Sequence, residues 1–280
     1  MLTSVTTPTD LYLDLLARTL TRALFEDSDE IVGLLSSHGT PSWKQRAGLV
    51  MAPWLERAGL ELVRKRPYDR EARENGRDWP ARAESMAGLK RMANARACIE
   101  AVLRDGVPGD VMETGVWRGG MSIYMRGVLR ANGDSDRKVW LADSFEGLPK
   151  AGSRRYKQDV SDDYEYDILS VGVDAVRRNF ERYGLMDDRV EFLVGWFKDT
   201  LQSAPVASLS VLRLDGDMYE STSQALEALY PKLSQGGYCI VDDYGIIDAC
   251  REAVDDYRRQ HEITDPIQDV DGWCVFWRRS

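Results

Sequence analysis

The chain has 280 residues, of which 43% are hydrophobic and 30% are charged, and its formal net charge at pH 7 is -9. A chain of this length can bury one large α/β domain with a helical addition, whereas two independent enzymatic domains would be crowded. The acidic balance argues against a nucleic-acid groove, because binding phosphates requires concentrated lysine and arginine. A small-molecule substrate is therefore expected.

Cysteine and histidine spacing gives no sign of a zinc site. The four cysteines lack CxxC spacing and the two histidines lie far apart, so we expect reduced, mostly buried cysteines. The N-terminus has no basic leader followed by an apolar core, and no stretch approaches the roughly 20 apolar residues of a membrane span. A cytoplasmic protein without a membrane partner is the expectation.

The first 105 residues are predicted to be mainly helical. Residues 9–26 carry an amphipathic stripe after a Thr/Asp start, and residues 43–65 are again predicted as a helix. Between residues 66 and 80 the sequence RPYDREARENGRDWP is charged and poor in apolar residues, which predicts a mobile loop. A further helix is predicted from Ala81 to Arg104, ending at a turn that contains Gly106.

From residue 106 onward, short apolar runs alternate with segments long enough to be helices. These runs are DVMETG, KVWLADS, RVEFLVG, LSVLRLDGD and GYCIVDDYG. This rhythm predicts a parallel, doubly wound sheet with ligands at the carboxyl ends of the strands. The last two pieces, EITDPIQDV and WCVFWRR, are separated by Asp271-Gly272, which indicates a tight antiparallel hairpin.

Five parallel strands closed by a hairpin form the sheet of class I S-adenosylmethionine (SAM) methyltransferases. The predicted fold is therefore an α/β, Rossmann-like seven-stranded sheet with an N-terminal helical addition or lid. We expect residues 1–105 to pack as helices and lid segments on a methyltransferase core of residues 106–280, as a single domain overall.

A glycine-containing loop follows the first strand of this core. The segment Glu113-Thr114-Gly115 ends the strand, and Gly119-Gly120 precede a predicted helix. Glycines let the backbone approach a ligand, and the helix N-terminus offers free N–H groups, so the loop is predicted to contact the methionine carboxylate and ribose of the cofactor. Alone, the pattern equally fits a plain strand-to-helix turn.

The end of the next strand strengthens this interpretation. It carries Asp143, about 30 residues after the loop, where an acidic side chain can bind both ribose hydroxyls. Ser144 and Phe145 could line an adenosine pocket. Gly195-Trp196-Phe197, after the third strand, could stack against adenine, although aromatics at strand ends are as often core residues.

Four aspartates follow two strands that should be neighbours in this sheet. Asp215 and Asp217 follow LSVLRL, and Asp242 and Asp243 end YCIVD. Crowded carboxylates take up a proton or a cation, and oxygen ligands without nearby histidine or cysteine favour Mg²⁺. We predict Asp215, Asp242 and Asp243 as metal ligands and Asp217 as general base. The alternative is that these aspartates only cap a helix and form a turn.

A metal would suit hydroxyl methylation. Coordination lowers the pKa of an alcohol and fixes its orientation, and Asp217 could then remove the proton as oxygen attacks the sulfonium methyl. A vicinal diol could chelate the ion, so a sugar or a catechol is the expected acceptor.

Long motifs make the chain resemble the macrocin O-methyltransferase (TylF-type) family, whose members methylate sugar hydroxyls on antibiotics such as macrolides and aminocoumarins. The most specific motifs are METGVWRGGMSIYMRGVL, VWLADSFEGLP, LRLDGDMYEST and IVDDYG, and the match covers most of the chain. The resemblance implies the same Mg²⁺ ligands and base, and cofactor contacts from Glu113 and Asp143. It also implies mobile N-terminal segments that close over a glycosylated small-molecule acceptor, and a homodimer or higher homo-oligomer.

Other functions remain open at this point. An aspartyl phosphotransferase would also use Asp-x-Asp, a second acidic pair and Mg²⁺, but it leaves the glycine loop and Asp143 without a role. A catechol-type phenol O-methyltransferase is a further alternative, because its vicinal oxygens could chelate the metal in the same way. A catalytically silent binding protein could also retain the fold. The polar segments 27–42 and 150–170 are either part of an acceptor lid or plain surface loops.

Overall fold

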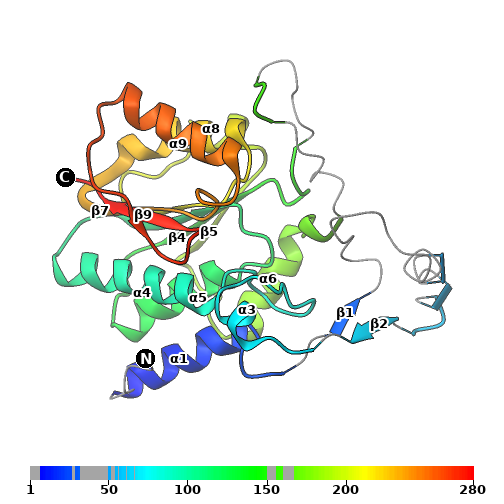
Figure 1. The fold of residues 1–280 in the computed structure, drawn as a ribbon. Coiled ribbons are helices and arrows are strands. Elements are labelled where there is room, and N and C mark those ends of the chain that lie inside the picture. Colours follow the sequence, from blue (N-terminus) through cyan, green and yellow to red (C-terminus); the bar gives the residue numbers. More distant parts are fainter. Residues whose placement is uncertain are drawn as a thin grey trace.

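A seven-stranded sheet forms the centre of the molecule, with helices on both of its faces (Figure 1). The structure is a computed structural model that describes residues 7–26, 29–31, 50–51, 54–55, 57–60, 62–65, 67–149, 156–159 and 167–280. The strands of this sheet are β3 (Asp110–Thr114), β4 (Val139–Asp143), β5 (Val190–Val194), β6 (Leu209–Leu214), β7 (Leu233–Val241), β8 (Gln268–Asp269) and β9 (Val275–Arg278). The predicted fold class is confirmed.

The strand order brings together the strands that carry the predicted site residues. It is β5-β4-β3-β6-β7-β9-β8, with β3 to β7 parallel and β9 antiparallel to β7. β6 lies between β3 and β7, as expected for the aspartate-bearing strands. All five parallel strands therefore present their carboxyl ends at one edge of the sheet. Between β3 and β6 the order in which the chain adds strands reverses, which is where α/β sheets typically bind ligands.

Two layers of helices cover the sheet and bury its alternating side chains. The elements on one face are α1 (Pro8–Leu20), α4 (Leu89–Arg104), α5 (Gly120–Ala131) and α6 (Val173–Arg182), and those toward the other are α7 (Phe197–Thr200), α8 (Tyr219–Leu229) and α9 (Asp248–Gln260). Along β3, Val111 packs in the core on the α4–α5 face, and Met112 packs in the core on the α8–α9 face. Because strand side chains alternate, Glu113 lies on the α4–α5 face.

The N-terminal region departs from the prediction in two places. Part of the predicted helix 43–65 is a strand, since β2 (Val63–Lys65) pairs antiparallel with β1 (Asp29–Ile31), apart from the main sheet (Figure 1). The predicted loop 66–80 contains the short helix α3 (Arg70–Glu74). Its Arg73 side chain is buried, and it donates to the carbonyls of Arg22 and Phe25 and to the carboxylate of Asp78.

The helix predicted from Ala81 begins only at Leu89. Before that, the backbone bonds to other segments: the N–H groups of Glu84 and Ser85 donate to the Leu20 carbonyl, and the Glu84 carbonyl accepts from Gly120. Gly88 lies so close to Gly76 that a Cβ atom on Gly88 would be 2.3 Å from the backbone nitrogen of Gly76. Tertiary contacts thus replace the first turns of the predicted helix.

The C-terminal hairpin is present, with a longer turn than predicted. β8 and β9 pair antiparallel, and five residues, 270–274, connect them. The Asp271 carboxylate accepts the backbone N–H groups of Trp273 and Cys274, which orders the turn. Trp277 of β9 is completely buried, and its ring N–H donates to the Tyr230 hydroxyl.

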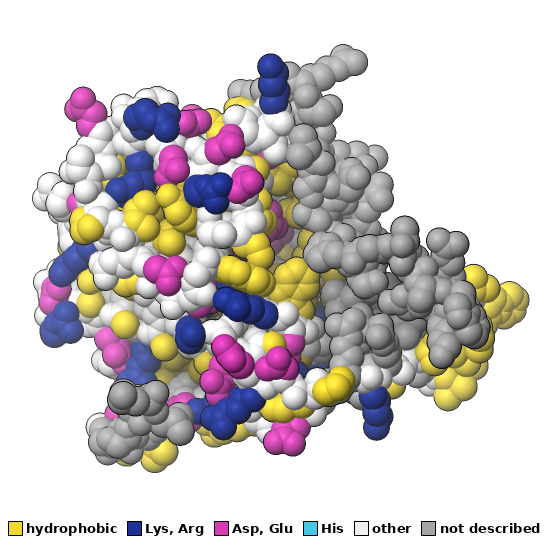
Figure 2. Space-filling view, in the orientation of Figure 1, with side chains coloured by type: hydrophobic (Ala, Val, Ile, Leu, Met, Phe, Trp, Pro, Cys, Tyr) yellow, Lys and Arg dark blue, Asp and Glu magenta, His cyan; other side chains and the backbone are white. Residues whose placement is uncertain are grey.

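The remaining general expectations concern the cysteines and the surface. All four cysteines are free and buried. None of the helices in the described parts of the chain has the length and apolarity needed to cross a membrane. The face in Figure 2 carries acidic and basic side chains interspersed over the described surface.

Candidate active site

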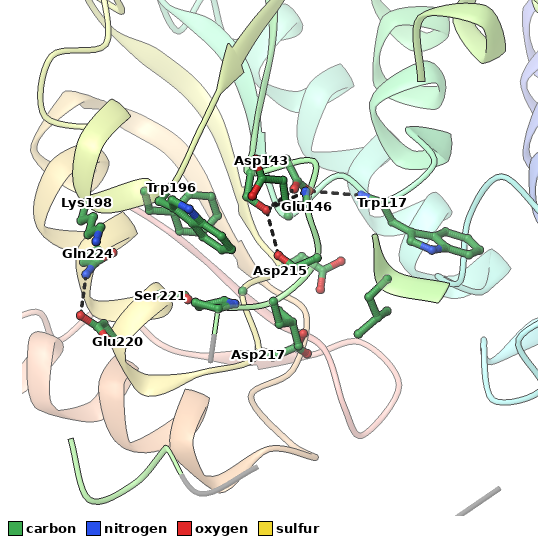
Figure 3. A pocket seen from close by; sticks show the side chains of 18 of the residues that line it. Trp117, Asp143, Glu146, Trp196, Lys198, Asp215, Asp217, Glu220, Ser221 and Gln224 are labelled. Atoms are coloured by element: carbon green, nitrogen blue, oxygen red, sulfur yellow. Dashed lines mark hydrogen bonds between the residues drawn. The ribbon is translucent and has the colours of Figure 1, made fainter. Parts of the chain in front are cut away.

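A pocket of about 520 Å³ opens at the carboxyl ends of the parallel strands. Its volume falls in the range of small-molecule sites. It is lined by residues after β3, β4, β5 and β6, together with the first turns of α8 (Figure 3). Figure 3 shows Asp143, Trp196, Asp215 and Asp217 around the same hollow. Several predicted cofactor residues and two of the four predicted acidic residues, Asp215 and Asp217, therefore line the same pocket.

The glycine loop after β3 packs directly against the end of β6. Gly115 has φ 79°, and a Cβ there would lie 1.6 Å from the Asp215 carbonyl oxygen, so only glycine fits. The Asp143 carboxylate accepts the N–H of Val116 at 2.6 Å and that of Phe145 at 2.7 Å. Asp143 thereby fixes the loop whose residues Gly115 and Trp117 line the pocket. Burial raises its pKa despite these backbone hydrogen bonds.

Five of the nine predicted cofactor residues line the pocket: Gly115, Asp143, Ser144, Trp196 and Phe197. The other four are not among the residues that line it. Phe145 packs against Phe192 in the core with ring centroids 6.1 Å apart, and Thr114 is completely buried in β3. The Gly195 N–H donates to the Asp143 carbonyl.

Glu113 is the fourth of these residues, and its carboxylate faces other protein groups. It accepts from Arg213 at 2.6 Å and from the Ser122 hydroxyl, and it is 2% exposed. Burial raises the pKa of Glu113 to about 7, although Arg213 and Ser122 favour the ionised form. A direct cofactor contact from this side chain stays a prediction.

The predicted metal ligands form a compact group. Asp215, Asp242 and Asp243 each offer one carboxylate oxygen, and these oxygens all lie within 4.8 Å of one another. Asp215 directly follows β6 and Asp242 directly follows β7, which pair in parallel. The sheet order alone thus brings the three side chains together, as predicted.

The two carboxylates after β7 have opposite electrostatic surroundings. Asp242 accepts from the guanidinium groups of Arg213 and Arg91, which outweigh the effect of burial and lower its pKa. Burial, followed by the charges of Asp217, Asp215 and Asp242, raises the pKa of Asp243 well above its usual range. Among the described residues, Asp243 Oδ2 has no hydrogen-bond partner.

An unpartnered buried carboxylate oxygen beside two further carboxylates fits a divalent cation. The donor set consists of oxygen atoms, which Mg²⁺ prefers, and a cation there would offset the repulsion that raises the pKa of Asp243. The residues present therefore suit the metal that the sequence predicts.

Asp217 lies on the pocket wall, two residues after Asp215 and just before α8. Its φ is 55°, a left-handed conformation that aspartate tolerates better than most residues. The buried carboxylate of Asp159 accepts the N–H groups of Tyr219 and Glu220 at 2.7 and 3.0 Å, which caps α8. The turn that carries Asp217 therefore has an anchored helix on its C-terminal side.

Sequence reasoning missed several residues that build the site. Arg91 and Arg213 hold the acidic group, Asp159 caps α8, and Met86 and Leu148 line the pocket. Arg213 could have been identified from the sequence, because a lone cation inside the apolar strand LSVLRL needs buried anionic partners. The segments 27–42 and 150–170, predicted as lid or loop, lie mostly outside the described residues.

Comparison with known proteins identifies the family. The model of the macrocin-O-methyltransferase (TylF) family matches residues 9–279. A Streptomyces olivaceus protein, 8-demethyl-8-(2,3-dimethoxy-alpha-L-rhamnosyl)-tetracenomycin-C 4'-O-methyltransferase, is 50% identical over 97% of this chain and 93% of its own length. Mycinamicin III 3''-O-methyltransferase of Micromonospora griseorubida is 45% identical over 99% of both chains.

A solved structure agrees with these sequence matches. The structure of the O-methyltransferase NovP is 43% identical and superposes with a TM-score of 0.82, covering 97% of this chain and 99% of that one. The resemblance inferred from the motifs is thereby confirmed. With its seven-stranded sheet and a family match over nearly its whole length, this chain is an O-methyltransferase that belongs to the macrocin-O-methyltransferase (TylF) family.

Proposed function

We propose that this protein transfers the methyl group of SAM to a hydroxyl of a deoxysugar on a glycosylated natural product of the macrolide or aminocoumarin type, with Mg²⁺ at the site. The observation that carries the proposal is a pocket lined by Asp143, Asp215 and Asp217, in which Asp215 also belongs to the compact carboxylate group with Asp242 and Asp243. The relatives support the acceptor class, since the name of one specifies a rhamnosyl group.

Each part of the pocket has a role in this proposal. Asp143 and Gly115 would hold the ribose and the methionine end of SAM, and Trp196 and Phe197 would face its adenine. Asp215, Asp242 and Asp243 would hold Mg²⁺, which lowers the pKa of a coordinated hydroxyl and orients it. Asp217 would accept the hydroxyl proton as the sugar oxygen attacks the methyl carbon and the sulfonium accepts the electron pair of the broken bond.

The test measures methyl transfer from SAM to a rhamnosyl glycoside and to a catechol, with Mg²⁺ and with EDTA. We expect transfer to the sugar, its loss in EDTA, and a decrease in kcat of about 10²- to 10⁴-fold for Asp217→Asn. Binding of S-adenosylhomocysteine to that variant should be retained in calorimetry. Asp188→Asn, at a site 85% exposed and outside the pocket, is the matched control.

The opposite results are equally informative. Preferential methylation of the catechol would replace the sugar acceptor with a phenol. Full activity in EDTA would remove the metal from the proposal, and unchanged kcat in Asp217→Asn would remove the base. Family membership favours methyl transfer over aspartyl phosphotransfer, which predicts phosphate release that this assay can monitor in parallel.

Two further expectations belong to the proposal. We expect a homodimer or higher homo-oligomer, which light scattering after size-exclusion chromatography measures directly. We also expect a cytoplasmic location, which cell fractionation tests.

A further inference from the structure

One arginine side chain links carboxylates carried by three neighbouring strands. Arg213 of β6 is 3% exposed, and its Nη1 donates to Glu113 of β3 at 2.6 Å and to Asp215 at 2.8 Å. Its Nη2 donates to Asp242, which follows β7. A single guanidinium therefore contacts two of the three proposed metal ligands and ties them to the strand that precedes the glycine loop.

Sheet register explains this arrangement. Glu113 and Arg213 are direct partners in the β3–β6 ladder, and the parallel pairing of β6 with β7 ends at Leu214 and Val241. Register partners on neighbouring strands lie on the same face of the sheet, so Arg213 shares the α4–α5 face with Glu113. Asp242 lies two residues after Ile240, the register partner of Arg213 on β7, and therefore extends the same face. The planar fork of arginine can serve several carboxylates at fixed angles, which a lysine ammonium cannot.

A second arginine completes the hold on Asp242. Arg91 of α4 donates to the Asp242 oxygen that Arg213 does not contact, and its Nε donates to Asp271 at 2.8 Å. Asp215 is held through Oδ2, and Asp243 keeps a buried, unpartnered oxygen among the described residues. The two arginines thus hold both oxygens of Asp242 and one oxygen of Asp215.

We propose that Arg213 is a positioning residue for the metal: it orients Asp215 and Asp242 and offsets their charge, so that the cation site is assembled before the cation arrives. This inference rests on the proposed function, because it assumes that these aspartates bind Mg²⁺. Protein groups that orient metal ligands in this way typically change metal affinity about 10- to 100-fold when they are substituted.

The experiment measures Mn²⁺ binding by electron paramagnetic resonance, with S-adenosylhomocysteine binding by calorimetry in parallel. The variants are Arg213→Lys and Arg213→Met. The matched control is Arg126→Lys, since Arg126 is 4% exposed and pairs with Asp187 outside the site. We expect Mn²⁺ affinity to decrease about 10- to 100-fold in both Arg213 variants and to stay unchanged in the control.

The lysine variant separates orientation from charge, because it keeps a cation but lacks the planar fork that meets Glu113, Asp215 and Asp242 at fixed angles. It also provides the answer if Arg213→Met does not fold. Folded Arg213 variants that bind Mn²⁺ as tightly as the wild type would overturn this inference alone. A wild-type protein that binds no Mn²⁺ would overturn the metal part of the proposed function, and this inference with it.

Discussion

Asp143 after the glycine loop and Asp242 after β7 lie on two halves of the same sheet edge, and different donors hold their carboxylates. Asp143 accepts backbone N–H groups, whereas Asp242 accepts from two arginine side chains. The pKa of Asp143 is raised and that of Asp242 is lowered. The half proposed to bind the cofactor, here the cofactor half, therefore depends on loop geometry. The half proposed to bind the cation, here the metal half, depends on compensated buried charge.

The largest expected effect comes from removing the Asp242 carboxylate in the metal half. In Asp242→Asn, the two buried arginines lose their shared anion, and one amide group must face an arginine donor. We expect the free energy of unfolding of the metal-free protein to decrease by about 3–5 kcal/mol, as for other broken buried ion pairs. Urea denaturation measures the change, and a decrease below about 1 kcal/mol would contradict the comparison.

A smaller effect is expected from the corresponding change in the loop half. Asp143→Asn keeps one oxygen acceptor, so it retains either the Val116 N–H or the Phe145 N–H. We expect a loss of about 2 kcal/mol in the free energy of unfolding, within the range for hydrogen bonds to charged groups. Calorimetry should also show weaker binding of S-adenosylhomocysteine. If the variant bound S-adenosylhomocysteine as tightly as the wild type, Asp143 would have no role in cofactor binding.

The smallest expected effect is a pH dependence from Glu113, on the metal half. Burial raises its pKa to about 7 from an ordinary value of 4.5, so between these values the folded protein binds more protons than the unfolded chain. Stability from this group is complete below pH 4.5 and is lost as pH rises through 7. Between pH 6 and pH 7, this group should lower the free energy of unfolding of the wild type by about 1 kcal/mol, and we expect this decrease to be absent in Glu113→Gln.

Urea denaturation of both metal-free proteins at several pH values provides this measurement. Identical slopes for the wild type and Glu113→Gln would mean that Glu113 is ionised throughout. In that case Arg213, rather than burial, would dominate its titration.

The sequence predicted the sheet well because the relevant signals are local. Each strand is a short apolar run, and the expected sheet order came from the class I methyltransferase fold that this pattern of strands matches. The meeting of Asp215, Asp242 and Asp243 required only the knowledge that their strands are neighbours. The site could be predicted to that extent.

The missed features depend on contacts between distant segments. The turns at residues 81–88 bond to Leu20 and Gly120, which local periodicity cannot reveal. Arg91 lies about 150 residues before Asp242, and its role depends on how α4 crosses the sheet. Phe145 follows Asp143 in sequence, but its side chain turns into the core. Sequence position near a site therefore did not establish a contact with the pocket.

The position of β9 in the chain order has a consequence for synthesis. β9 lies between β7 and β8 in the sheet, yet it is translated after every other strand of the core. Until residues 275–278 leave the ribosome, the nascent protein exposes an open edge along β7, and such edges promote association between chains. Asp271, the partner of Arg91, emerges equally late. The metal half of the site is therefore completed last, when the core is otherwise present.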